Sequence, residues 1–105
     1  MRYAVSLIAA LPLFVASISL AADGAAIFKQ NCASCHGATG HADTPAGKAL
    51  KVPPLAGDAK VAGMSDADVT AAIKANPKHG AMLKKLSDDD IAAVATYVKG
   101  LAAAK

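Results

Sequence analysis

The segment Cys32-Ala33-Ser34-Cys35-His36 contains the only two cysteines of this 105-residue chain, with a histidine directly after the second. Two thiols one helical turn apart can each bond one vinyl group on adjacent sides of a porphyrin, and the following imidazole can then reach the iron. The pattern therefore predicts one covalently attached haem c, held by Cys32 and Cys35, with His36 as the proximal iron ligand.

Three other sites use two cysteines at this spacing: a structural disulfide, half of a zinc site and a thioredoxin-type redox pair. A zinc site needs four ligands at regular spacing, whereas the other histidines, His41 and His79, are far apart in the sequence. A redox pair belongs to a βαβ pattern, which we do not find in this sequence. The added histidine makes haem attachment the more specific interpretation.

Residues 1–21 have the features of a signal peptide, and we predict cleavage after Ala21. Arg2 supplies one positive charge, the run from Tyr3 to Leu20 is uncharged and mostly apolar, and small residues precede the predicted cleavage point. The uncharged run of roughly 20 residues also has the length of an uncleaved membrane anchor. Either alternative predicts export, and we expect a periplasmic location.

Residues 22–105 then form a single domain that is short of bulky side chains. Its aromatic residues are only Phe28 and Tyr97, and alanine is abundant. A haem would supply the missing apolar bulk, so the helices need only wrap around it. The net charge of +3 becomes +2 without Arg2, which is too mild for a nucleic-acid-binding protein.

The sequence predicts an all-α fold with three main helices. The first begins after Asp23 and runs toward Cys32, the second begins after Ser65 and ends before Pro77, and the third begins after Ser87. Gly100 is a candidate C-cap or frayed end of the third helix. The intervening segment 37–63 is rich in Gly and Pro without a clear period, and we expect a short helix around Lys48.

These residues resemble the class I cytochromes c, small proteins in which helices and loops enclose one covalent haem, and the similarity covers essentially all of residues 22–105. Gly24, Phe28 and Tyr97 match the family positions at which the first and last helices cross. Pro53 matches the family proline whose carbonyl accepts a hydrogen bond from the proximal histidine. The resemblance thus implies a cytochrome c fold in which Pro53 fixes the His36 ring.

The resemblance also implies a methionine as the second iron ligand, in a loop before the last helix. Met82 matches that place, although Leu83 replaces the usual proline. His79 is the alternative ligand, and a vacant or water-bound sixth position is the third choice. Met64 is expected to be an apolar residue at the start of the second helix, and His41 an exposed loop residue.

Histidine and methionine together fill the iron's coordination sphere, so we expect an electron carrier rather than an enzyme. The expected partners are donor and acceptor proteins with acidic patches, which would approach a lysine-lined haem edge, and the carrier would be a monomer. Two alternatives are a gas sensor or peroxidase-like protein with an open sixth site, and an electron-transfer module of a larger oxidoreductase. The lysines that would line this edge are Lys29, Lys48, Lys51, Lys74, Lys78, Lys84 and Lys85.

Overall fold

The computed structural model describes residues 23–104, and this part of the chain is helical without strands, as predicted. The predicted signal peptide and its cleavage point lie outside the described residues. Among the described helices, none has the length and apolar character needed to cross a membrane. The elements are α1 (Gly24–Asn31), α2 (Ala33–His36), α3 (Pro45–Ala49), α4 (Ala59–Ala62), α5 (Asp66–Ala75), the 3₁₀ helix η1 (Pro77–His79), α6 (Gly80–Leu83) and α7 (Asp88–Ala103).

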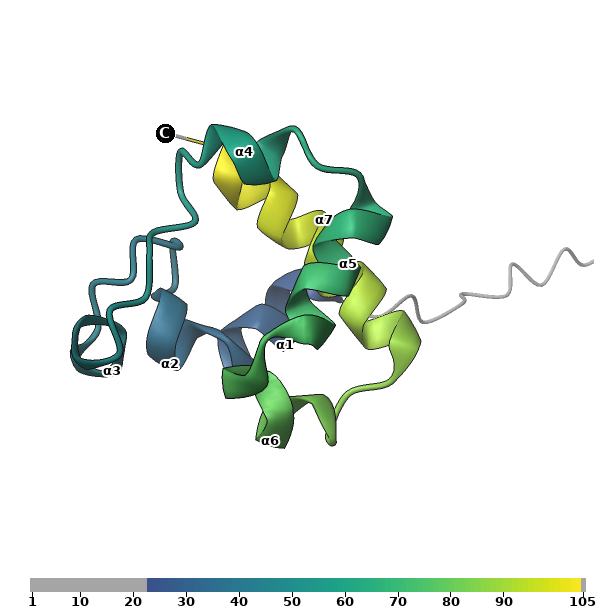
Figure 1. The fold of residues 1–105 in the computed structure, drawn as a ribbon, viewed down its shortest axis with the longest axis horizontal. Helices are drawn as coiled ribbons and strands as arrows, with labels where there is room; N and C mark the ends of the chain where they lie inside the picture. The colour runs from purple at the N-terminus through teal and green to yellow at the C-terminus, as the bar shows by residue number, and fades with distance from the viewer. Residues whose placement is uncertain (1–22, 105) are drawn as a thin grey trace, which may run out of the picture.

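Helix α7 is the central element of the fold, and it packs against α1, α5 and α4 (Figure 1). The crossing of α1 and α7 is close because Gly24 has no side chain: a Cβ atom there would collide with the carbonyl oxygen of Ala93. One turn further along, the rings of Phe28 and Tyr97 pack with centroids 5.3 Å apart. The structure thus brings together the three residues that the sequence analysis assigned to this crossing.

The predicted helix starts are confirmed by side-chain caps. Asp23 accepts hydrogen bonds from the amides of residues 25 and 26, and Ser65 accepts one from the Asp68 amide. Ser87 and Asp90 form a complete capping box at the start of α7. The prediction for Gly100 was wrong, because α7 continues through this residue to Ala103, and its packing against α4 and α1 outweighs the low helix propensity of one glycine.

The core is small and lies where α1, α5 and α7 meet. Its buried side chains come from one residue of α1, one of α5 and three of α7, and Tyr97 and Leu101 pack against them while remaining partly exposed. This cluster forms one side of the larger cavity described below. The buried members are Phe28, Val69, Val94, Ala95 and Val98.

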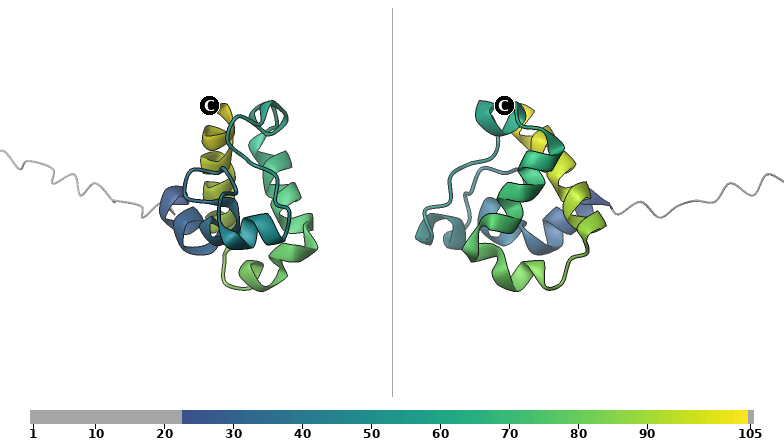
Figure 2. Two further views of the ribbon diagram at one scale, coloured as in Figure 1. Left: turned by 90° about the vertical axis from the view of Figure 1, so that its left-hand side faces the viewer. Right: turned by 45° about the vertical axis from the view of Figure 1, so that its right-hand side comes forward.

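The segment 37–58 wraps around one side of the molecule (Figure 2) and is held by backbone hydrogen bonds. Gly40 has a φ of 79°, and its carbonyl accepts hydrogen bonds from the amides of Leu55 and Ala56. The short helix expected around Lys48 is α3, whereas α4 lies in a stretch for which the sequence analysis predicted no helix. The hydrogen bonds accepted by the Gly40 carbonyl explain how a segment rich in Gly and Pro keeps a defined path.

Candidate haem site

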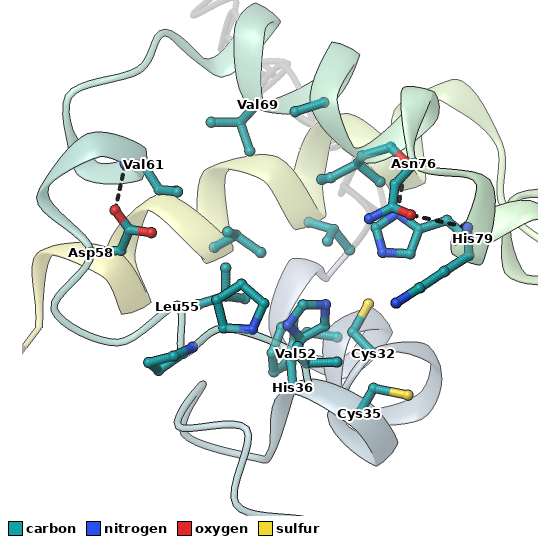
Figure 3. Close-up of a pocket in the computed structure, with 18 of the residues that line it drawn as sticks. Cys32, Cys35, His36, Val52, Leu55, Asp58, Val61, Val69, Asn76 and His79 are labelled. Carbon is teal, nitrogen blue, oxygen red and sulfur yellow. Dashed lines mark hydrogen bonds between the residues drawn. The ribbon is translucent and has the colours of Figure 1, made fainter. Parts of the chain in front are cut away.

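A cavity of about 470 Å³ opens between the helices, and its walls come from elements distant in the sequence (Figure 3). One wall, which we call the attachment wall, consists of the end of α1, α2 and the stretch 50–55. The opposite wall, the facing wall, consists of the last turn of α5, η1 and α6. Core side chains of α5 and α7, including Val69, Val94 and Val98, also line the cavity.

The cavity brings together every site residue predicted from the sequence. Cys32, Cys35, His36 and Pro53 line it from the attachment wall, and Met82 lines it from the facing wall. His79, the alternative iron ligand, also lines the cavity. His41 does not; it is exposed, and its Nδ1 lies 2.7 Å from Thr39 Oγ1.

The two cysteines are positioned by a helix junction. Cys32 is the C-cap of α1 and the N-cap of α2, and Cys35 follows one turn later within α2. Both are free cysteines and both are half-buried, so the structure gives no support to the disulfide alternative. Figure 3 shows both sulfur atoms beside His36 at one end of the cavity.

The electrostatic environment of Cys32 differs from that of a redox-active cysteine. Burial raises the pKa of the Cys32 thiol to about 11, and the neighbouring Cys35 adds to this effect. Reactive cysteine pairs have lowered pKa values instead. Residues 23–104 also contain no cluster of three or more His, Cys, Asp or Glu side chains that could hold a metal ion. Neither the redox pair nor the zinc site is therefore supported.

The surroundings of His36 favour its neutral form. Burial lowers its pKa, and the nearby His79 ring lowers it further, which favours an imidazole with a lone pair available for a metal. Its Nδ1 atom is buried without a hydrogen-bond partner. The bond that we predicted from this ring to the Pro53 carbonyl is therefore not formed in this structure, although Pro53 lines the same cavity.

The facing wall carries the two other candidate ligands. Met82 lies in the one-turn helix α6 rather than in an open loop, and its Sδ is 3.8 Å from Cys32 Sγ. The His79 ring is half-buried, with its centroid 6.2 Å from that of His36. Both candidates therefore approach the attachment wall across the cavity.

Two residues that support the site were missed by the sequence analysis. Thr44 caps α3, and its hydroxyl lies 2.7 Å from the Ser34 carbonyl oxygen and 3.3 Å from that of Cys35. Gly47 allows α3 to approach α2 so closely that a Cβ atom would collide with the Cys35 carbonyl oxygen. The pair Thr44-Pro45 is a typical helix start, so it could have been found as a cap, but not as a support of α2.

The cavity fits a haem by its lining and by its donor set. Apolar side chains from α1, α5, α7 and the stretch 50–55 supply most of its surface, as a flat apolar ligand requires. Two free thiols one helical turn apart adjoin a neutral imidazole, and the buried Nδ1 of that ring lacks a partner. The fold and the site together define a c-type cytochrome domain.

Comparison with known proteins agrees with this class. The family model described as cytochrome C oxidase, cbb3-type, subunit III matches residues 19–98. The cbb3-type cytochrome c oxidase subunit FixP of Rhizobium meliloti (strain 1021) is 35% identical over 85 residues. That match covers 78% of this chain but 28% of FixP, and no solved structure matched the chain.

The chain belongs to the cbb3-type cytochrome c oxidase subunit III family. It is a c-type cytochrome whose cofactor is covalently bound haem c, and it acts as an electron-transfer component. The predictions of an all-α cytochrome c fold and of haem c are thereby confirmed.

Proposed function

We propose that this chain is an electron-transfer module of a larger oxidoreductase of the cbb3 oxidase type, acting on the exported side of the membrane. The observation that carries the proposal is the apolar cavity with Cys32, Cys35 and His36 at one end, in a chain whose family is that of an oxidase subunit. Residues 1–21 would direct export as a signal peptide, and residues 22–105 would form the working domain. A freely diffusing monomeric carrier is the second candidate.

In this proposal Cys32 and Cys35 hold the haem through thioether bonds, and His36 binds the iron from the attachment wall. Bound haem supplies a one-electron Fe(III)/Fe(II) couple. Met82 would supply a thioether ligand from the facing wall, and iron held by both His36 and Met82 would have no open position for oxygen or peroxide. Pro53 would accept the hydrogen bond that the His36 Nδ1 lacks in this structure, which would increase the ligand strength of the ring.

The docking surface would lie at the mouth of the cavity. Leu50 is 47% exposed and is the one large hydrophobic residue so exposed among residues 23–104. Lys51 and Lys78 line the cavity beside it, and Lys78 Nζ lies 3.4 Å from the Leu50 carbonyl oxygen. An apolar centre with cationic neighbours suits a partner with an acidic rim. Lys74 is engaged elsewhere, with its Nζ 2.9 Å from Asp88.

The test uses the full chain, tagged and produced in a bacterium that attaches haem c and contains a cbb3-type oxidase. We expect the chain to copurify with the catalytic oxidase subunit from solubilised membranes, and reduced chain to be oxidised rapidly when oxygen is added. Recovery of the chain only from the soluble periplasmic fraction, with oxidation that slows as salt increases, would favour the free carrier. A reduced chain that oxidase fails to oxidise would contradict both.

The contribution of the docking surface can be measured in the same assay. Charge reversal in Lys51→Glu and Lys78→Glu should slow oxidation by the oxidase, because an acidic partner would repel the variant. Lys60→Glu, at an exposed position of α4 that does not line the cavity, is the matched control. Equal rates for all three variants would exclude an acidic partner surface at this mouth.

A further inference from the structure

A hydrogen bond to the backbone carbonyl of Ile73 holds the ring of His79 in the cavity wall. This carbonyl has no backbone N–H donor of its own. Ile73 lies in the last turn of α5, where its carbonyl oxygen would normally accept from the amide of residue 77. Pro77 has no amide hydrogen, so this carbonyl lacks its helical partner. His79 Nδ1 lies 2.7 Å from the Ile73 oxygen and replaces the missing donor.

This bond determines which nitrogen of His79 is free. Because a carbonyl oxygen only accepts, Nδ1 must carry the hydrogen, and the lone pair of the neutral ring is then on Nε2. Histidines that bind metals are commonly oriented in this way, by donating their other ring N–H to a backbone carbonyl. Of the two histidines that line the cavity, His79 has this support and His36 does not.

The separation of the two rings fits a metal between them. An imidazole nitrogen binds a metal at about 2 Å, so two rings on opposite sides of one ion have centroids roughly 6 Å apart. The centroids of His36 and His79 are 6.2 Å apart. Met82 follows three residues after His79, and its sulfur lies near Cys32 instead.

We propose that His79 is a standby ligand of the haem iron, which occupies the sixth position whenever Met82 leaves it. This inference rests on the proposed function, because it requires haem attached at Cys32 and Cys35 with His36 as the first ligand. The exchange breaks one iron–sulfur bond and forms one iron–nitrogen bond. It releases no proton, because Nε2 already holds its lone pair. A second imidazole would lower the reduction potential, since methionine ligation raises it.

The test compares purified holoprotein variants by visible absorption and electron paramagnetic resonance in the oxidised state, and by carbon monoxide binding in the reduced state. We expect Met82→Ala to be low-spin with two nitrogen ligands, to lack the weak red absorption of methionine-bound iron, and to bind carbon monoxide slowly. Met82→Ala combined with His79→Gln should be high-spin and bind carbon monoxide rapidly. The glutamine amide can still donate to the Ile73 carbonyl, so this variant retains the structural role of residue 79.

The matched control is Met82→Ala with His41→Ala, which removes an exposed histidine outside the cavity and should behave like Met82→Ala alone. A high-spin Met82→Ala variant would overturn the proposal, and so would a low-spin spectrum that persists after His79→Gln. Haem staining of each variant on a denaturing gel tests the proposed function separately. Loss of stain would count against haem attachment, whereas stained protein with an open site would count against His79 alone.

Discussion

The two walls of the cavity differ in how the chain holds them. The attachment wall is joined to the rest of the fold by the crossing of α1 and α7 and by the close approach of α3 to α2. In the facing wall, η1 contacts α5, and α6 has its main contacts with η1. Neither of these short elements has its main contacts with the central helix α7.

This difference matches the roles that we propose for the ligands. Cys32, Cys35 and His36 lie on a junction whose backbone is confined by glycine contacts and by the Thr44 hydroxyl. His79 and Met82 lie on the two successive short elements η1 and α6, and the proposed ligand exchange would require movement only within this part of the facing wall. A permanent ligand thus comes from the strongly packed wall, and an exchangeable ligand from the weakly packed one.

The largest effect is expected from removing the attachment chemistry itself. Cys32→Ala combined with Cys35→Ala should abolish covalent haem binding, because no other cysteine exists in the chain. Mass spectrometry should show the polypeptide without haem, and the gel should show no haem stain. Ser34→Ala, between the two cysteines, is the control and should retain haem. Haem that stays attached in the double variant would contradict this account of the attachment wall.

A second comparison tests the packing of the two walls. Phe28 is 1% exposed, and Phe28→Ala should lower the free energy of unfolding by about 3–5 kcal/mol. Leu83 in α6 is half-buried, so Leu83→Ala should lower it by only about 1 kcal/mol. Urea denaturation of the oxidised holoprotein measures both values. Equal losses would show that the facing wall is packed as firmly as the attachment wall.

A pair of glycines allows the same comparison with a single methyl group. Gly24→Ala should destabilise the protein by about 1–3 kcal/mol, because the added Cβ would collide with the Ala93 carbonyl. A Cβ atom added at Gly80 in α6 would meet no other atom within 4 Å, and Gly80→Ala should stabilise the protein by about 0.4–1 kcal/mol. Thermal denaturation of both variants gives the sign of each change. A stabilised Gly24→Ala would refute the close crossing.

The variant Thr44→Val tests whether the hydrogen bonds of the Thr44 hydroxyl stabilise the packing of α2 against α3. Thr44→Val keeps the shape of the side chain but removes its hydroxyl, and should cost about 1 kcal/mol of stability through loss of the cap. Thr39→Val is the control, because the Thr39 hydroxyl makes an exposed contact with His41. Urea midpoints should fall for Thr44→Val and change little for Thr39→Val. A larger loss in Thr39→Val than in Thr44→Val would show that the Thr44 hydroxyl does not stabilise the packing of α2 against α3.

The smallest effect concerns the ion pair that joins α5 to α7. Hydrogen bonds from Lys99 and then from Thr96 hold the pKa of the Asp66 carboxyl below its usual range. A lowered folded-state pKa contributes stability above the unfolded pKa, and this contribution is lost as the pH falls through the folded value. Wild-type protein should therefore exceed Asp66→Asn in urea midpoint at neutral pH, and the difference should shrink as the pH falls below the ordinary range of a carboxyl pKa. A difference in urea midpoint that does not change with pH would exclude the lowered pKa of Asp66 as its cause.

The sequence by itself determined the chemistry of one wall and the starts of the main helices. Cys32, Cys35 and His36 are adjacent in the chain, so their spacing predicts haem attachment without knowledge of the fold. The caps at Asp23, Ser65 and Ser87 act within one helical turn, and such local contacts can be inferred from a short segment.

The resemblance pointed to Met82 and His79, but only the tertiary structure decided how these residues face that wall. The contact of Met82 with Cys32 and the position of His79 opposite His36 depend on how α5, η1 and α6 fold back across the cavity. The support of α2 by Thr44 and Gly47 likewise joins residues about ten positions apart. Local patterns record which residues neighbour one another along the chain, whereas the geometry between the two walls arises from contacts between elements that are distant in the sequence.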